Sequence, residues 1–126
     1  MKRYVALLLV ATASVAVAAV RAPGYVSVFI SDNRAIGMSI SPNNPQEADD
    51  IASSSCVEYA EAEDKATCVK ALEGVAKCVA VARSEEGAWA AAMGETAKKA
   101  SDLAVKTCKK YTKNKCVVDK AAKLCL

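Results

Sequence analysis

The chain has 126 residues with a formal net charge of +3, and it contains six cysteines and no histidine. This length suits one domain with a modest core, for which extra cross-links are an advantage. The absence of histidine excludes histidine-based catalytic triads and the common zinc sites from this chain.

Residues 1–18 have the layout of a secretory signal peptide. Lys2 and Arg3 precede an uncharged, alanine-rich stretch, and Ala16-Val17-Ala18 is a small-x-small cleavage site. The alternative, an uncleaved membrane anchor, is disfavoured because the apolar stretch is short for a helix that spans a bilayer. We expect cleavage to leave residues 19–24 as a short N-terminal linker, with no stable membrane span.

The remaining residues, 25–126, are predicted to form a single α+β domain built from two tandem copies of one unit. The copies cover residues 25–77 and 78–126. Each copy opens with a predicted hairpin, because strand-like segments flank the turn Asp32-Asn33 in one copy and Glu85-Glu86-Gly87 in the other. The four hairpin strands are predicted at residues 25–31, 34–41, 78–84 and 88–94.

A helix with a shared pattern is predicted after each hairpin. The stretch ADDIASSSCVEYA begins at Ala48, and ASDLAVKTCKKYT begins 52 residues later. Asn44 and Thr96 are the expected N-caps, and Pro45 suits a first helical position. Residues at helical spacing are expected to bury one face of each helix. They are Ala48, Ile51, Ala52, Ser55, Cys56 and Tyr59 in the first helix, and Ala100, Leu103, Ala104, Thr107, Cys108 and Tyr111 in the second.

A short third strand is predicted after each helix, over residues 67–73 and residues 115–121. The predicted unit is therefore strand, strand, helix, strand. We predict an α+β fold in which the two β-β-α-β repeats form one antiparallel sheet, with both helices packed on one face of it.

The six cysteines are predicted to form three disulfides, since an even number behind a signal peptide is typical of an oxidising compartment. No Cys-x-x-Cys is present, so a metal site has little support. If both copies use their cysteines alike, Cys56 pairs with Cys68 and Cys108 with Cys116, and Cys78 and Cys125 then link the two copies. The main alternative joins Cys68 to Cys78, Cys116 to Cys125 and Cys56 to Cys108.

Several segments share the alternating strands, the Ala–Cys helix and the following cysteines. One set is YVSVFIS, AIGMS, EADDIASSSC and CVAVA, and the second set is AWAAAMGET, KASDLAVKTC, KKYTKNKC and Cys125. Together they resemble a family of secreted bacterial proteins called domain of unknown function 4189, over about residues 25–125. The family usually opens with an aromatic residue followed by Gly-Ala-Ile-Ala, whereas here Gly24 precedes Tyr25. The resemblance implies a fold and an extracytoplasmic compartment, and no established activity.

Charge is unevenly spread along the chain. Residues 46–86 hold ten acidic and four basic residues, a net −6, whereas residues 98–126 hold nine lysines and two aspartates, a net +7. The two regions either attract each other and aid solubility or present a lysine-rich face to an anionic partner. The candidate partner-binding basic face consists of Lys98, Lys99, Lys106, Lys109, Lys110, Lys113 and Lys115.

No motif predicts an enzyme, a cofactor or a metal. The cluster Ser53-Ser54-Ser55-Cys56 falls on a predicted helix surface. The carboxylates of Glu61, Glu63 and Asp64, or of Glu85 and Glu86, resemble glycosidase pairs only in residue type. Nucleic acid is disfavoured as a partner, because the lysine run KKYTKNKC has one aromatic residue, Tyr111, which the helix pattern assigns to the core.

These observations predict a small exported binding protein, stabilised by disulfides, that sequesters or inhibits another protein in the periplasm. The alternatives are a secreted effector that acts on a host or neighbouring cell and an envelope structural protein. A protein partner is expected, and an anionic envelope surface is a second candidate partner for the lysines.

Overall fold

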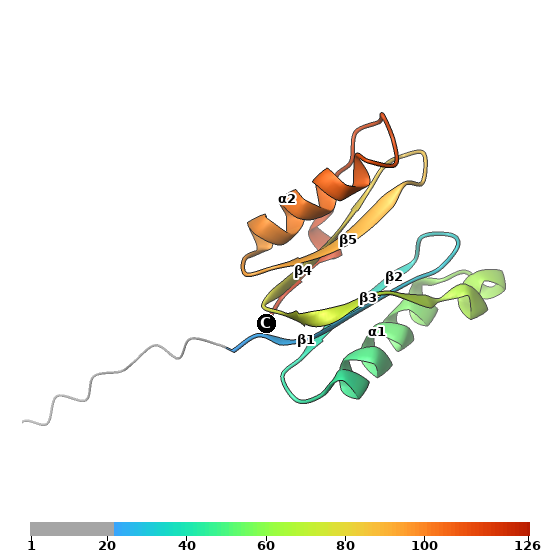
Figure 1. Ribbon diagram of the computed structural model, residues 1–126. Coiled ribbons are helices and arrows are strands. Elements are labelled where there is room, and N and C mark those ends of the chain that lie inside the picture. The colour runs from blue at the N-terminus through green and yellow to red at the C-terminus, as the bar shows by residue number, and fades with distance from the viewer. Residues whose placement is uncertain (1–21) are drawn as a thin grey trace, which may run out of the picture.

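The computed structural model describes residues 22–126, so the predicted signal peptide and residues 19–21 of the predicted linker lie outside the described residues. We call residues 22–77 the first half and residues 78–126 the second half. The elements, in chain order, are β1 (Gly24–Ile30), β2 (Ile36–Ser41), α1 (Pro45–Tyr59), η1 (Ala62–Thr67), β3 (Val69–Ala76), β4 (Cys78–Arg83), β5 (Trp89–Gly94), α2 (Ala97–Cys108), η2 (Lys120–Ala122) and β6 (Lys123–Cys125) (Figure 1).

Two three-stranded antiparallel sheets lie between the two helices. Their strand orders are β2-β1-β3 and β5-β4-β6, so each half builds its own sheet in the same order. Helix α1 packs on β1 and β2, and α2 packs on β4 and β5 (Figure 1). The α+β prediction and its order of strand, strand, helix and strand are confirmed. The prediction of one continuous sheet with both helices on one face is wrong.

Each sheet has two buried faces of different character, which explains why there are two sheets. Val28 and Val81 are fully buried in a core that both sheets share. The opposite faces carry small side chains such as Ser27 and Ala80, both also fully buried. A strand of this kind has two faces to cover. The other sheet covers the valine face, and a helix covers the small-residue face.

The buried face of each helix is narrower than predicted. It consists of three small side chains one turn apart, namely Ala48, Ala52 and Cys56 in α1 and Ala100, Ala104 and Cys108 in α2. Ile51 and Leu103 are 49% and 48% exposed, and Tyr59 and Tyr111 are 69% and 73% exposed. Their predicted burial is therefore wrong.

A close approach between α1 and β2 accounts for this difference. A Cβ placed on Gly37 would lie 1.9 Å from the Ala52 carbonyl oxygen and 2.5 Å from the Cys56 nitrogen. At that distance only alanine, serine, cysteine or glycine fits between helix and sheet. Ile51 and Tyr59 consequently project beside the helix rather than beneath it.

Both helices begin where the sequence predicts. The Asn44 side chain accepts a hydrogen bond from the Glu47 N–H at 2.8 Å, and the Thr96 hydroxyl accepts one from the Lys99 N–H at 3.1 Å. These bonds satisfy backbone donors that have no partner inside the helix.

The third strand of the second half lies later in the chain than predicted. In the predicted strand at residues 115–121 only Val117 bridges to Arg83. The side chain of Arg83 pairs with Asp119, and the turn η2 follows, so the ladder with β4 is interrupted. It resumes in β6, which pairs with β4 over three residues.

Three disulfides join Cys56 to Cys68, Cys108 to Cys116 and Cys78 to Cys125, which is the pairing favoured from the sequence. The predicted role of Cys78–Cys125 is wrong, because it does not link the two halves. It joins β4 to β6 within one sheet, where the two cysteines lie directly opposite each other.

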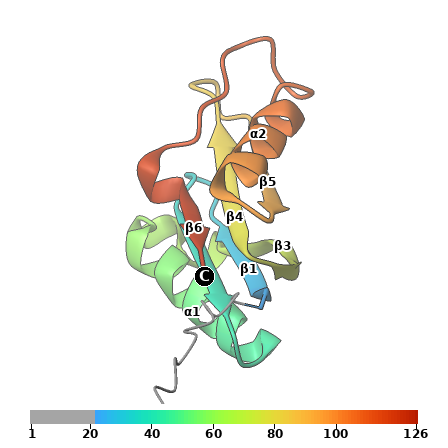
Figure 2. The ribbon, with the colours of Figure 1, turned by 90° about the vertical axis from the view of Figure 1, so that its left-hand side faces the viewer.

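The two ends of the described chain lie together. The Leu126 N–H donates a hydrogen bond to the Lys77 carbonyl at 2.8 Å. A Cβ on Gly24 would lie 3.2 Å from Cδ2 of Leu126. Figure 2 shows the C-terminus beside the start of β1.

The close approach at Gly37 makes a strong prediction. Gly37→Ala should lower the free energy of unfolding by about 3 kcal/mol or more, because the new methyl group meets backbone atoms that move only with α1. Urea unfolding measures this change. Gly74→Ala in β3 is the matched control, since its Cβ would meet only the flexible end of Met93, and it should cost less than about 1 kcal/mol. Equal costs at the two positions would contradict the close approach.

Each disulfide should contribute more to the free energy of unfolding the longer the loop that it closes. The sequence separations are 47 residues for Cys78–Cys125, 12 for Cys56–Cys68 and 8 for Cys108–Cys116. Loop-closure entropy then gives about 4, 3 and 2.5 kcal/mol respectively. Replacing each pair by alanines and measuring urea unfolding tests this order. Excess reductant should abolish the differences in stability among the three variants. If removal of Cys78–Cys125 cost the least, the predicted order would be refuted.

Candidate functional site

The carboxylates considered from the sequence lie at separate places on the surface. Glu61, Glu63 and Asp64 lie on η1, with carboxylate oxygens within 4.8 Å of one another. Glu85 and Glu86 lie in the turn between β4 and β5, and Glu86 accepts a hydrogen bond from the Thr112 hydroxyl at 3.1 Å. The structure therefore does not bring the two groups of carboxylates into one site.

The seven lysines of the predicted basic face divide into two groups. Lys98 and Lys99 lie in the first turn of α2, where they pair with Asp102 and Glu95 on the same segment. The hydrogen bond to Asp102 raises the pKa of Lys98 above its usual value. The other five form what we call the lysine loop, at the end of α2 and in the segment that follows it. They are Lys106, Lys109, Lys110, Lys113 and Lys115.

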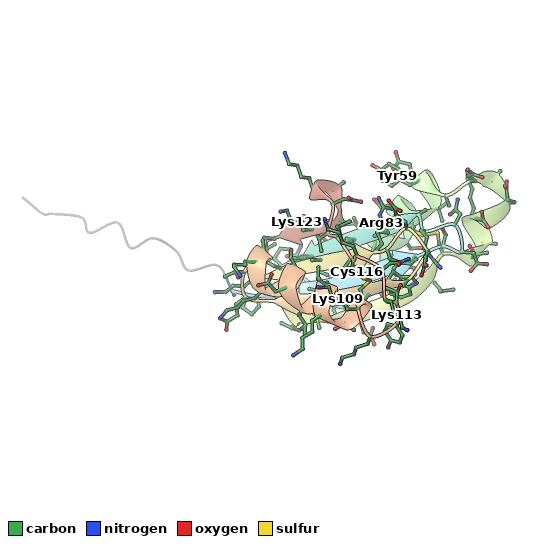
Figure 3. All side chains as sticks on the ribbon, turned by 90° about the horizontal axis from the view of Figure 1, so that it is seen from above. Tyr59, Arg83, Lys109, Lys113, Cys116 and Lys123 are labelled. Atoms are coloured by element: carbon green, nitrogen blue, oxygen red, sulfur yellow. A yellow bond between two sulfur atoms is a disulfide. The ribbon has the colours of Figure 1, made fainter. Side chains whose placement is uncertain are left out.

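The lysine loop carries uncompensated positive charge on a fixed backbone. All five of its lysines are exposed, and none has a carboxylate within 4 Å among residues 22–126. Three links hold the loop: the Cys108–Cys116 disulfide, the bridge between Arg83 and Val117, and the Thr112 hydrogen bond to Glu86. Figure 3 labels Lys109 and Lys113 on this segment, with Cys116 at its end.

An aromatic groove adjoins the lysine loop. Its walls are Trp89 and Ala91 of β5, Thr107 of α2, and Tyr111 at the start of the loop. Its volume is about 430 Å³, and it opens widely to solvent. Such a volume lies within the range of sites that receive a large side chain or a small ligand. We call it the Trp89 groove.

The first half builds a groove at the equivalent place, which we call the Tyr59 groove. Ile36 and Tyr59 stand where Trp89 and Tyr111 stand in the second half, 53 and 52 residues later. This groove has a volume of about 300 Å³, and Arg34, Arg83 and Asp119 also line it. Figure 3 shows Tyr59 and Arg83 from the same viewpoint as Lys109 and Lys113.

A charged network fixes α1 to its sheet. The fully buried Ser27 hydroxyl donates to Oδ1 of Asp49 at 2.7 Å, and Lys70 of β3 pairs with Oδ2 at 2.7 Å. The hydrogen bond from Lys70, and then that from Ser27, lowers the pKa of the Asp49 carboxyl. The hydrogen bond to Asp49, and then that to Glu73, raises the pKa of Lys70. This network positions the helix whose last turn carries Tyr59.

The groove residues Trp89, Tyr111, Arg34 and Tyr59 were not identified from the sequence. A signal for the tyrosines was nevertheless present. A stripe of small residues four apart, such as Ala100, Ala104 and Cys108, already completes a narrow helix face. Tyr111 comes after the last small residue of that stripe, and its side chain is too large for the narrow space that the stripe fills. A surface position follows.

None of the helices in residues 22–126 is long and apolar enough to cross a membrane. The three disulfides indicate an oxidising, extracytoplasmic environment. A family model described as "Domain of unknown function (DUF4189)" matches residues 23–122. No match is found among curated proteins or among solved structures.

The Asp49 network predicts a pH-dependent stability. Because the pKa of Asp49 is lower in the folded protein than its ordinary value of 3.8, its contribution is present above that pH and is lost as the pH falls through the folded pKa. Asp49→Asn should therefore lower the melting temperature at neutral pH, and the difference from the unchanged protein should shrink in acid. The asparagine oxygen can still accept from Ser27, so the comparison isolates the charge. A difference that grows in acid would contradict this assignment.

Proposed function

Because the chain belongs to the DUF4189 family, whose description assigns no activity, we propose a function from the surface that the fold presents. The protein is a secreted or periplasmic binding protein rather than an enzyme. It sequesters or inhibits another protein, which it recognises through the Trp89 groove and the adjoining lysine loop.

One observation carries this proposal: Thr107 and Tyr111, which line an open aromatic groove, belong to the same segment as five lysines that have no carboxylate partner in the described part of the chain. Tryptophan and tyrosine supply much of the binding energy at protein interfaces, since each buries a large apolar area around one polar group. Unpaired surface lysines attract an acidic partner and accelerate its association. The combination fits an acidic protein segment that inserts an apolar side chain.

The rigidity of the loop supports the same conclusion. A loop that is already ordered loses little conformational entropy when it binds. The disulfide and the bridge between Arg83 and Val117 hold the lysine loop at both ends. The backbone positions that carry its lysines are therefore fixed before a partner arrives.

The test begins with a photo-crosslinking amino acid at position 111 and, as the control, at position 69, an exposed residue of β3 that lines neither groove, in cells that produce the protein. We expect a protein adduct from position 111. Purified partner and protein are then compared by surface plasmon resonance. An adduct with anionic envelope polymer at position 111, and none with protein, would contradict the proposal.

Variants of the groove and the loop should affect binding differently. Trp89→Ala and Tyr111→Ala should each weaken affinity by about 30-fold or more, as expected for anchors of an interface, mainly through faster dissociation. Lys113→Glu should slow association, and added salt should reduce its effect. Lys98→Glu is the control with the same charge change, because Lys98 is paired with Asp102. Equal effects of Lys98→Glu and Lys113→Glu would exclude the lysine loop as the binding surface.

A further inference from the structure

The hairpin turns of the two halves are built in the same way around different residues. In each turn a buried serine, Ser31 or Ser84, accepts hydrogen bonds at its backbone and side-chain oxygens from the residues that follow. The residue three positions after that serine has a left-handed backbone, and it is Gly87 with φ 92° in the second half. The first half has Arg34 there, with φ 69°.

Arginine at this position carries a cost that glycine does not. The left-handed region brings Cβ close to the backbone, so a residue with a side chain adopts it at the expense of folding free energy. Gly87 shows that this turn forms well with glycine. The side chain of Arg34 must therefore serve a purpose that the turn itself does not require.

Arg34 lines the Tyr59 groove, and its guanidinium extends to the neighbouring turn at Gly87. Its Nη2 lies 3.0 Å from the position of a Cβ on Gly87, so the side chain lies across the neighbouring turn. No carboxylate among residues 22–126 lies within ion-pair distance of it. Asp119, the acidic residue that lines the groove, already pairs with Nε and Nη2 of Arg83.

Apart from the Arg83–Asp119 ion pair, the rest of the groove is apolar and aromatic. Ile36, Ala35, Ala121 and Ala122 line it, and the exposed ring of Tyr59 stands beside it. A sugar would bury several hydroxyl groups against methyl groups here. A group with one negative charge and one apolar side chain would leave nothing unsatisfied.

We propose that the Tyr59 groove binds the C-terminal residue of a peptide, with Arg34 bound to the terminal carboxylate and Tyr59 in contact with the terminal side chain. Guanidinium and carboxylate form two parallel hydrogen bonds, which gives such a site both strength and orientation. The volume of about 300 Å³ limits the site to about one residue. This site is separate from the Trp89 groove and does not depend on the function proposed for it.

The probes are N-acetyl-L-phenylalanine, which has a carboxylate, and N-acetyl-L-phenylalaninamide, which does not. Titration of ¹⁵N-labelled protein with the acid should shift the Arg34 Nε–H signal. The protein should bind the amide at least about tenfold more weakly than the acid. Tyr59→Ala should weaken binding of the acid. Tyr111→Ala, the equivalent change in the other half, should leave it unchanged.

Arg34→Gly separates a binding role from a structural one. We expect this variant to lose binding of the acid by about tenfold or more while its melting temperature rises by roughly 4–8 °C, because the turn is relieved of strain. A lower melting temperature would show that Arg34 is retained to hold the two turns together, which would overturn the proposal. Equal binding of acid and amide, no binding of either, or an equal effect of Tyr59→Ala and Tyr111→Ala would overturn it too.

Discussion

The short distance between each helix and its sheet is the constraint on which the rest of the structure depends. Where Gly37 lies under the backbone of Ala52 and Cys56, no larger side chain fits. Close packing of small residues gives little apolar burial per residue, so the core depends on the valines between the sheets and on three disulfides. In the first half the same closeness displaces Tyr59 to the surface, where it becomes the wall of a groove.

Local pattern was enough to predict the two hairpins, the two helices, their caps and the disulfide partners, because each is decided by near neighbours in the chain or by the repeat. Asn44 and Thr96, for example, act on residues three positions away. The number of sheets was not predictable in this way. It depends on whether Val28 and Val81 lie on the same surface or on facing surfaces, and period-two alternation is identical in both cases. The grooves were missed because Trp89 and Tyr111 meet only in three dimensions.

The two halves have kept one architecture and diverged in side chains both within the helix–sheet contact and at the surface. Ser27 and Asp49 form a charged network in the first half, whereas their counterparts in the second, Ala80 and Ser101, form none. Ile36 corresponds to Trp89, so the second groove gained an aromatic wall. The lysine loop has no basic counterpart in the first half, where the segment after α1 is acidic. Positive charge is thus concentrated in the second half and negative charge in the first, while the backbone plan is shared.

The contact between Gly24 and Leu126 has a consequence for how this protein can be attached or rearranged. Both ends leave the fold at one side, and the hairpin turns and the lysine loop lie at the other (Figure 1). A tether or a fused protein at either end would therefore leave both grooves free. A short linker could join Leu126 to Gly24, and new ends could be opened in the exposed segment after α2, which would give a circular permutant with the same packing.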